Sequence, residues 1–88
     1  MISINRFRWT ENNIAHIARH QVTFEEAEEV FDAPHYLRRV GKIRYTALGR
    51  TNAGRYLFVG FDYSEQEVYV VTARSMSYKE KNLYQREV

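Results

Sequence analysis

Residues 68–84 read VYVVTARSMSYKEKNLY, and the change of pattern inside this segment organises the whole chain. The segment opens with five β-branched or aromatic residues, Val68–Thr72, a composition that suits a pleated, half-buried strand. Ser77 and Glu80 then have the spacing of a capping box, which predicts that a helix begins there. Arg74 lies between the two elements. We expect a strand end to hold such a cation firmly while leaving it open to an anion.

The length and composition indicate one domain, to which we assign residues 1–88. The chain contains no cysteine, which excludes disulfides and thiolate metal sites and favours an intracellular, cytoplasmic protein. No apolar run approaches the ~20 residues of a membrane helix. The N-terminus also lacks the apolar core of a signal peptide. We therefore expect no membrane partner.

Charge is distributed unevenly, although the formal net charge is only +2. Acids crowd residues 25–32, whereas residues 33–61 contain no acid and six cations. This asymmetry predicts a surface for a polyanion such as RNA or DNA. The alternative is a solvated sheet face, or one that pairs across space with the acidic helix. The six cations are Arg38, Arg39, Lys42, Arg44, Arg50 and Arg55.

Two threonines predict the starts of two N-terminal helices. Thr10 suits the N-cap of a first helix to about His20, because its hydroxyl can accept a first-turn amide. Thr23 and Glu26 have the spacing of a second capping box. We expect this second helix to end before Pro34, because proline disfavours helix at the residue before it.

Short turns separate four later segments that have strand composition. Residues 51–54 are predicted to form a hairpin turn, in which we expect Asn52 and Gly54 to adopt positive φ. Strands joined by such turns are antiparallel. Residues 3–8 add a short edge strand, and a last helix runs over residues 77–86. The prediction is an α+β domain: two N-terminal helices on one face of a three- to four-stranded antiparallel sheet, with a C-terminal helix. The four segments are residues 36–40, 43–50, 55–62 and 67–74.

His16 and His20 are four residues apart and therefore share a helix face. The zinc-protease pattern needs Glu directly after the first histidine, but Ile17 stands there. A third ligand is not evident, although His35 is available, so we expect no metal and no other cofactor. His20 ends a helix beside Arg19, where the helix dipole favours cations. Alternatively, His20 is a general acid or base, because its ordinary pKa of about 6.5 suits proton transfer.

Arginine, lysine and tyrosine side chains supply further candidates. Arginine binds phosphate through a planar fork and can stabilise a developing phosphorane, whereas the plainer interpretation is surface ion pairing. Tyrosines can stack on bases or simply pack, and a basic helix can follow a phosphate backbone or only face solvent. The arginines are Arg44, Arg50, Arg55 and Arg74; the tyrosines are Tyr56, Tyr69, Tyr78 and Tyr84; the basic helix carries Lys79, Lys81 and Arg86.

An ordered set of motifs spans nearly the whole chain. It comprises Trp9-x-x-x-Asn13, Arg19-His20, Val22-x-Phe24-Glu25-Glu26-Ala27, Val30-Phe31, Arg44, Ala47-x-Gly49-Arg50, Gly54-Arg55 and Thr72-Ala73-Arg74, followed by Glu80-x-x-x-Tyr84. In this order the motifs resemble those of BrnT-like toxins. The resemblance implies a RelE-like fold and a type II toxin that cleaves RNA without metal to halt translation. It also implies a cognate BrnA-like antitoxin. Operator DNA would be bound only by that antitoxin and not by this chain directly.

Under a first hypothesis, a toxin-type endoribonuclease, we assign roles to individual residues. The catalytic set would be Arg74 and Arg44 for the phosphate and the transition state, His20 with Arg19 for proton transfer, and Tyr84 for orienting the scissile group. The RNA-binding set would be Arg50, Arg55, Lys79 and Lys81. The acidic segment, residues 25–32, either receives a basic antitoxin segment or forms a solvated helix face.

Two departures from the family pattern favour a second hypothesis. The Lys-His-Gly common in the family is here Arg19-His20-Gln21, and its usual Arg-Arg-Ala is here Arg74-Ser75-Met76. Arginine is a poor base, and Gln21 must make the helix break despite carrying a Cβ. The second hypothesis is a catalytically weak or inactive toxin relative that binds the antitoxin or acts as a corepressor. A third is a plain nucleic-acid binder whose affinity falls steeply with salt.

Overall fold

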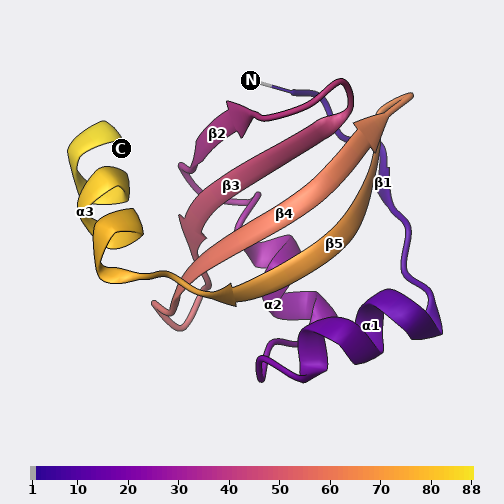
Figure 1. Cartoon of the computed structure of the whole chain (residues 1–88), viewed down its shortest axis with the longest axis horizontal. Helices are drawn as coiled ribbons and strands as arrows, with labels where there is room; N and C mark the ends of the chain where they lie inside the picture. The colour runs from indigo at the N-terminus through magenta and orange to yellow at the C-terminus, as the bar shows by residue number, and fades with distance from the viewer. Residues whose placement is uncertain (1) are drawn as a thin grey trace.

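The computed structural model describes residues 2–88, and in them a mixed sheet lies between helices (Figure 1). The strands are β1 (Arg6–Phe7), β2 (Tyr36–Arg39), β3 (Arg44–Arg50), β4 (Tyr56–Ser64) and β5 (Glu67–Ser75); the helices are α1 (Glu11–Ala18), α2 (Phe24–Glu29) and α3 (Tyr78–Glu87). The strand order is β1-β5-β4-β3-β2. β2 to β5 form the predicted antiparallel meander. The predicted edge strand is β1, which pairs parallel to β5 and makes the sheet five-stranded.

The three helices begin where capping residues were expected. Thr10, Thr23 and Ser77 are N-caps, and each belongs to a complete capping box, so free first-turn amides are satisfied locally. Helix α1 ends at Ala18 with Arg19 as its C-cap, slightly before the predicted end at about His20. The chain then turns, and Gln21 adopts a φ of 59°, a left-handed conformation that ends the helical path.

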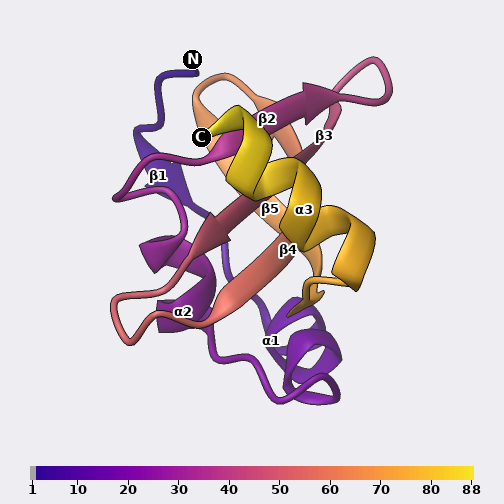
Figure 2. The ribbon, with the colours of Figure 1, turned by 90° about the vertical axis from the view of Figure 1, so that its left-hand side faces the viewer.

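The two faces of the sheet have different cover. α1 and α2 lie on one side, whereas α3 lies on the other and runs across β3, as Figures 1 and 2 show. Because side chains alternate along a strand, Leu57, Val59 and Phe61 enter the helix-covered core, where each is 0% exposed. Tyr56 and Phe58 therefore point to the side of α3. We call this second side, only partly covered by α3, the open face.

α1 lies along the outer edge of β5 beyond the short pairing with β1. Asn13 connects the two, because its side-chain Nδ2 donates to the backbone oxygens of Val70 (3.2 Å) and Arg8 (3.1 Å). Asn13 is 3% exposed, so these bonds satisfy a buried amide. Helix α1 is thereby held beside one border of the open face.

Two turns and one bulge shape the ends of the sheet. In the β3–β4 turn only Gly54 has a positive φ (91°), so the prediction for Asn52 is wrong. The β4–β5 turn uses Glu65 and Gln66 at φ 51° and 60°, the conformation of a two-residue hairpin turn. The β4–β5 register shifts between Gly60 and Phe61, which leaves an extra residue on β5. Of the helices in residues 2–88, none has the length and apolarity that crossing a membrane requires.

Candidate functional site

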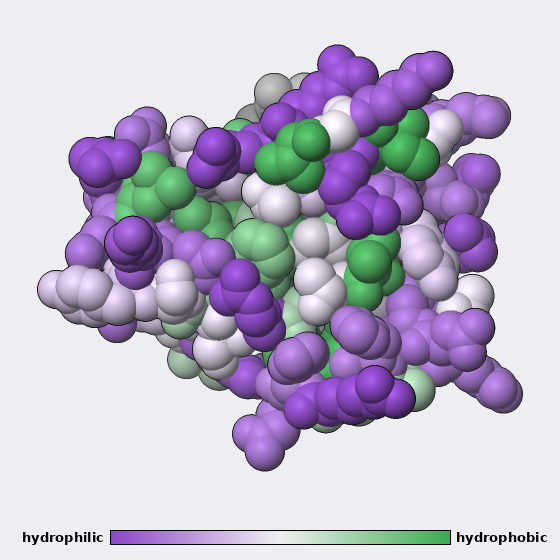
Figure 3. Space-filling model, viewed as in Figure 1, coloured by the Kyte–Doolittle hydropathy of each residue, from purple (hydrophilic) through white to green (hydrophobic). Residues whose placement is uncertain are grey.

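Cations and aromatic rings meet on the open face. All four cation–π contacts found in residues 2–88 lie there, on three rings from the neighbouring strands β4 and β5. Figure 3 shows this side with pale and green residues in the middle and hydrophilic residues around them. The distances from cation to ring centroid are 4.6 Å for Arg50 and 4.3 Å for Lys81 over Tyr56, 4.1 Å for Arg74 over Phe58, and 4.2 Å for Arg8 over Tyr69.

The densest part is the Tyr56 cluster, which consists of Arg50, Tyr56, Lys81 and Tyr84. Tyr84 reaches from α3 to Tyr56, with ring centroids 5.8 Å apart and planes at 82°. Arg50 donates to the carbonyl of Gly54 at 3.2 Å. Neither Arg50 nor Lys81 has a carboxylate within salt-bridge distance among residues 2–88. The cluster therefore presents two cations without acidic partners among residues 2–88, both beside the Tyr56 ring.

Arg74 lies next to this cluster but is held by α3. Its two terminal nitrogens donate to the two carboxylate oxygens of Glu80 at 2.8 and 2.9 Å. These bonds raise the pKa of Arg74 and are the main reason that the pKa of Glu80 lies below its ordinary value. The predicted cation is thus fixed at the strand end, but a phosphate would have to share it with a carboxylate.

Arg44 shares the open face with Arg74 but lies at the other end of the sheet. Arg74 pairs with Phe58 and Arg44 with Asp62, four residues apart on β4, or about 13 Å at ~3.3 Å per residue. Arg44 binds Asp62 through both Nε and Nη2, which raises its pKa. The structure therefore does not bring the two predicted phosphate-binding arginines together.

Arg55 ties three segments of the protein together. Its Nη1 donates to the carbonyl of Gln21 at 2.6 Å and contacts the carboxylate of Glu26 at 3.3 and 3.4 Å. Its Nη2 lies 3.4 Å from both the His20 carbonyl and the Ser75 hydroxyl. The end of α1, the start of α2 and the end of β5 are joined by this single guanidinium, most of whose donors are in use.

His20 and Arg19 lie at this same end of the sheet, and both are exposed. The His20 backbone shares an Arg55 nitrogen with Ser75, the residue after Arg74. The rings of His16 and His20 are edge-to-face with centroids 5.9 Å apart. Within the described part of the chain, no group of three or more His, Asp or Glu side chains is arranged to hold a metal ion.

The six cations of residues 33–61 divide into two groups. Arg44 and Arg55 have carboxylate partners distant in sequence, whereas the other four have none among residues 2–88. On α3, Lys79 is exposed and likewise lacks an acidic partner within residues 2–88. Acids of α2 are also engaged within the chain: Glu26 binds Arg55, and Glu28 accepts a hydrogen bond from the Trp9 indole at 2.7 Å. Glu29 likewise accepts from the Asn52 amide at 3.0 Å.

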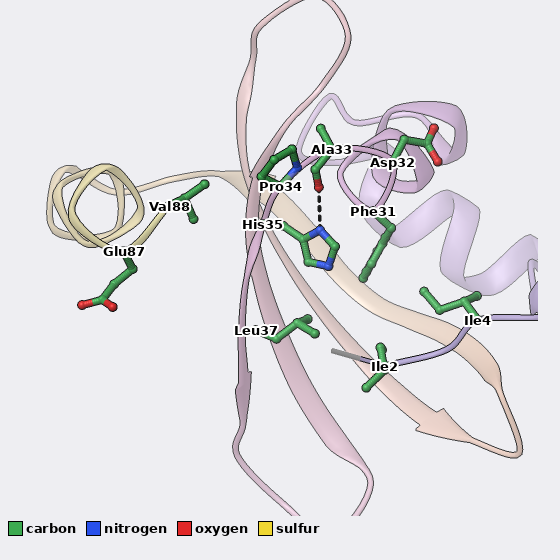
Figure 4. A pocket seen from close by; sticks show the side chains of 10 residues that line it. All are labelled: Ile2, Ile4, Phe31, Asp32, Ala33, Pro34, His35, Leu37, Glu87 and Val88. Atoms are coloured by element: carbon green, nitrogen blue, oxygen red, sulfur yellow. Dashed lines mark hydrogen bonds between the residues drawn. The ribbon is translucent and has the colours of Figure 1, made fainter.

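A separate hollow lies away from these cations, around the free edge of β2. It has a volume of about 890 Å³ and is lined mainly by apolar side chains, with His35 near its centre (Figure 4). The His35 Nδ1 is 2.7 Å from the carbonyl of Ala33, and its ring stands edge-to-face on Phe31. Asp32 and Glu87 are the acids in its lining. Its chemistry is that of a protein-contact or apolar-ligand surface.

Several contributors were missed from sequence. Phe58 and Arg8 carry two of the four cation–π contacts, and Glu80 was interpreted only as a capping residue. The alternation of RYLFVGFD does place Tyr56 and Phe58 on one face. The contacts of Arg8 with Tyr69 and of Arg74 with Glu80 depend on strand register and helix placement, for which the sequence has no local signal.

The family of the chain follows from a match over most of its length. The family model described as the ribonuclease toxin BrnT of type II toxin-antitoxin systems matches residues 9–80. The chain belongs to the BrnT family. The matched range includes the Arg50–Tyr56 pair, Arg74 and Glu80. Membership in such a family implies an RNA substrate and a cognate antitoxin.

A solved structure has the same fold. The chain is similar to the crystal structure of the Brucella abortus ribonuclease toxin BrnT, with a TM-score of 0.65 and 22% sequence identity. The match covers 82% of this chain and 96% of the Brucella chain. No curated protein sequence matches this chain. The α+β fold and the resemblance to BrnT toxins expected from the sequence are therefore confirmed.

Proposed function

We propose that this BrnT-family chain is a metal-independent endoribonuclease that cleaves RNA at the Tyr56 cluster and thereby halts translation in the cytoplasm. One observation carries the proposal: Arg50 and Lys81 lie within 4.6 Å of the centroid of the same ring and lack acidic partners among residues 2–88. Each of these cations can bind a phosphate oxygen of an RNA strand that crosses the cluster. Arg74, at the adjacent ring, is a third cation, and it shares its charge with Glu80.

The proposed chemistry is an attack by the ribose 2′-oxygen on the neighbouring phosphorus. A bond forms between these atoms, the bond to the 5′-oxygen breaks, and a 2′,3′-cyclic phosphate and a 5′-hydroxyl result. One proton leaves the 2′-hydroxyl and one is delivered to the 5′-oxygen. Arg50, Lys81 and Arg74 would stabilise the charge that develops on the phosphorane. Tyr84 would orient the scissile group.

For the proton transfers we propose His20, with Arg19 beside it. His20 is exposed, and its backbone is joined through Arg55 to Ser75, directly after Arg74. The turn after α1 that carries His20 is thereby held beside the end of β5 that carries Arg74. The ordinary pKa range of histidine suits both halves of the reaction near neutral pH.

The remaining predicted residues receive more limited roles. Arg44 would bind a phosphate away from the scissile one, because it lies at the other end of the open face and shares its charge with Asp62. Lys79 would extend the phosphate-binding track along α3. Arg55 would position the site from within the protein, because its donors are already occupied.

The test is cleavage of single-stranded RNA by the purified protein in the presence of a metal chelator. We expect products with 2′,3′-cyclic phosphate ends, and at least about a tenfold loss of rate in the Arg50→Ala/Lys81→Ala variant, equivalent to ~1.4 kcal/mol. The matched control is Arg39→Ala/Lys42→Ala, which removes the same charge from the β2–β3 hairpin. Equal losses in the two variants, or cleavage that requires added metal, would contradict the proposal.

A second candidate function rests on the Arg74–Glu80 pair. The carboxylate occupies both terminal nitrogens of the arginine that would meet the phosphate. In this alternative the chain is a weak or inactive toxin homologue that binds a BrnA-like antitoxin as a corepressor, with operator DNA bound only through that partner. Purified protein that binds the antitoxin but leaves RNA intact would favour this alternative. Restored cleavage in Glu80→Gln would identify the pair as the cause.

A further inference from the structure

A second, smaller hollow lies at the far border of the open face. It has a volume of about 280 Å³ and is lined by Asn12, Asn13 and His16 of α1 and by Tyr69 and Val71 of β5. This is just below the ~300–1,000 Å³ of typical small-molecule sites. A hollow of this size suits a single planar group better than a protein segment.

The backbone shapes this hollow through the bulge on β5. Phe61 pairs with Val70 and Gly60 with Thr72, so Val71 is the extra residue. Val71 can therefore line the hollow beside Tyr69 while Val70 remains fully buried in the core. Bulges occur preferentially where a strand must re-aim a side chain next to a functional site.

The walls combine an aromatic ring, a cation and unused polar groups. Arg8 lies 4.2 Å from the centroid of the Tyr69 ring. Its Nε also contacts Glu67 at 3.3 Å, but Glu67 is shared with Arg6, so one acid faces two cations. The side chains of Asn12 and His16 make no hydrogen bond to any described residue and lie one helical turn apart. Each can donate and accept hydrogen bonds in neutral form.

The hollow and the Tyr56 cluster lie along the same face of the sheet, the open face. Tyr69 pairs with Asp62, six residues along β4 from Tyr56, which corresponds to about 20 Å at ~3.3 Å per residue. Phe58, Gly60 and Thr72 form the floor between them on the open face. A Cβ on Gly60 would lie 3.1 Å from Thr72 Cγ2, so the floor is already closely packed at this point.

We propose that this hollow is a base-recognition subsite for single-stranded RNA, occupied by one unstacked base that lies on Tyr69 with Asn12 and His16 at its edge. The proposal rests on the function proposed above and extends it, because it assigns sequence preference to a hollow between α1 and β5 that is separate from the Tyr56 cluster. Specific RNA recognition commonly reads such splayed bases through aromatic stacking and hydrogen bonds to the base edge.

The experiment measures binding without cleavage. The probe is a fluorescent polyuridine strand with blocked 2′-hydroxyls that carries one test nucleotide: adenosine, cytidine, guanosine or an abasic unit. We expect the affinity of the parent protein to differ among these probes and so to rank them. The abasic probe should bind more weakly than the probe that carries the preferred base. For Tyr69→Ala we expect about a tenfold loss of affinity, which is the scale of base–aromatic stacking. This variant should also bind all four probes with the same affinity. For Asn12→Ala we expect smaller differences in affinity among the three bases, whereas the abasic probe should still bind more weakly than the others.

Control variants keep the result interpretable. Val40→Ala removes an apolar side chain that is 56% exposed just after β2, and this variant should bind every probe like the parent. Tyr69→Phe preserves the ring and should preserve affinity, which guards against a folding defect in Tyr69→Ala. Unchanged affinity and ranking in both Tyr69→Ala and Asn12→Ala would overturn the subsite. So would an unchanged RNA profile combined with weaker antitoxin binding, which would assign the hollow to a protein interface.

Failure of the subsite can be distinguished from failure of the proposed function. If Arg50→Ala/Lys81→Ala still binds and cleaves like the parent while Tyr69→Ala loses ranking, the cluster assignment fails and the subsite stands. If the double variant loses activity while Tyr69→Ala and Asn12→Ala match the parent, the subsite fails alone.

Discussion

The two faces of the sheet use alternate residues of the same strands for different purposes. On β4, Leu57, Val59 and Phe61 are fully buried under α1 and α2. The intervening Tyr56 and Phe58 stay half-buried, and cations lie over their rings. Burial of apolar area stabilises the first face, whereas the second has aromatic surface and charge left for a ligand. The comparison predicts that stability and the proposed RNA binding can be changed separately in one strand.

A matched contrast exists within the β3–β4 hairpin. Arg50 and Arg55 flank the same turn, but Arg55 is bound by Glu26 and by backbone carbonyls, whereas Arg50 lacks an acidic partner among residues 2–88. Their side chains leave on opposite sides of the sheet, because Arg55 precedes Tyr56 by one residue. One arginine therefore holds the fold together and the other is available to a phosphate.

The largest expected effect is a difference in stability between two variants, each of which loses one aromatic ring from one face of the sheet. Phe61→Ala removes a ring that is 0% exposed, and we expect a loss of ~3–5 kcal/mol in the free energy of unfolding. Phe58→Ala removes a half-buried ring and should cost about 1 kcal/mol, mainly the cation–π contact with Arg74. Urea unfolding followed by circular dichroism measures both. Similar costs for the two variants would contradict the division between the faces.

A smaller effect is expected from the two hairpin arginines. Arg55→Met removes charge-assisted hydrogen bonds to three segments and should lower the free energy of unfolding by about 1–2 kcal/mol, reduced by its partial exposure. Arg50→Met should change stability by less than about 0.5 kcal/mol. The same urea titration compares them, and a larger loss for Arg50→Met than for Arg55→Met would reverse the assignment.

The turn after α1 offers a stabilising change. Gln21 holds a φ of 59°, where a residue with a Cβ pays ~1–2 kcal/mol. Glycine removes this strain but loses about 0.5–1 kcal/mol through its flexible unfolded state. Gln21→Gly should therefore stabilise the protein by about 0.5–1 kcal/mol, seen as a higher melting temperature. A lower melting temperature would mean that the Gln21 side chain itself stabilises the turn.

The smallest effect is a pH dependence of the Arg74–Glu80 pair. The hydrogen bonds from Arg74 lower the folded-state pKa of Glu80 below 4.5, its ordinary value. The pair therefore stabilises the protein above the unfolded pKa, and this contribution is lost as pH falls through the folded pKa. Because both side chains are partly exposed, it should be below about 1 kcal/mol.

The Glu80→Gln variant removes the ionisable carboxyl and therefore isolates the pH-dependent contribution of the Arg74–Glu80 pair to stability. We expect the parent to exceed the variant in stability near neutral pH and the difference to shrink below about pH 4.5, where the unfolded carboxyl also becomes protonated. Thermal unfolding of both proteins across this range measures the difference. A difference that stays constant from neutral to acidic pH would assign the effect of the variant to packing.

Much of the fold was predictable because its signals are local. Capping residues act within three positions, so Thr10, Thr23 and Ser77 correctly predicted the helix starts. Strand alternation and short turns predicted the antiparallel meander. The end of α1 was predicted slightly late and the φ of Asn52 was missed, because a turn has several solutions and tertiary bonds, such as that from Arg55 to the Gln21 carbonyl, select one.

The candidate site was less predictable, because the charge available at a residue depends on partners distant in sequence. Arg44 meets Asp62 and Arg55 meets Glu26 only after the strands and helices have assembled. Arg74 lies in β5, one residue before the strand ends at Ser75, close to the predicted place. The placement of α3 decides that Glu80 binds Arg74 and that Lys81 joins Arg50 over Tyr56. Local patterns therefore establish which elements form, whereas register and packing establish which cations remain free, because electrostatic pairing acts through space rather than along the chain.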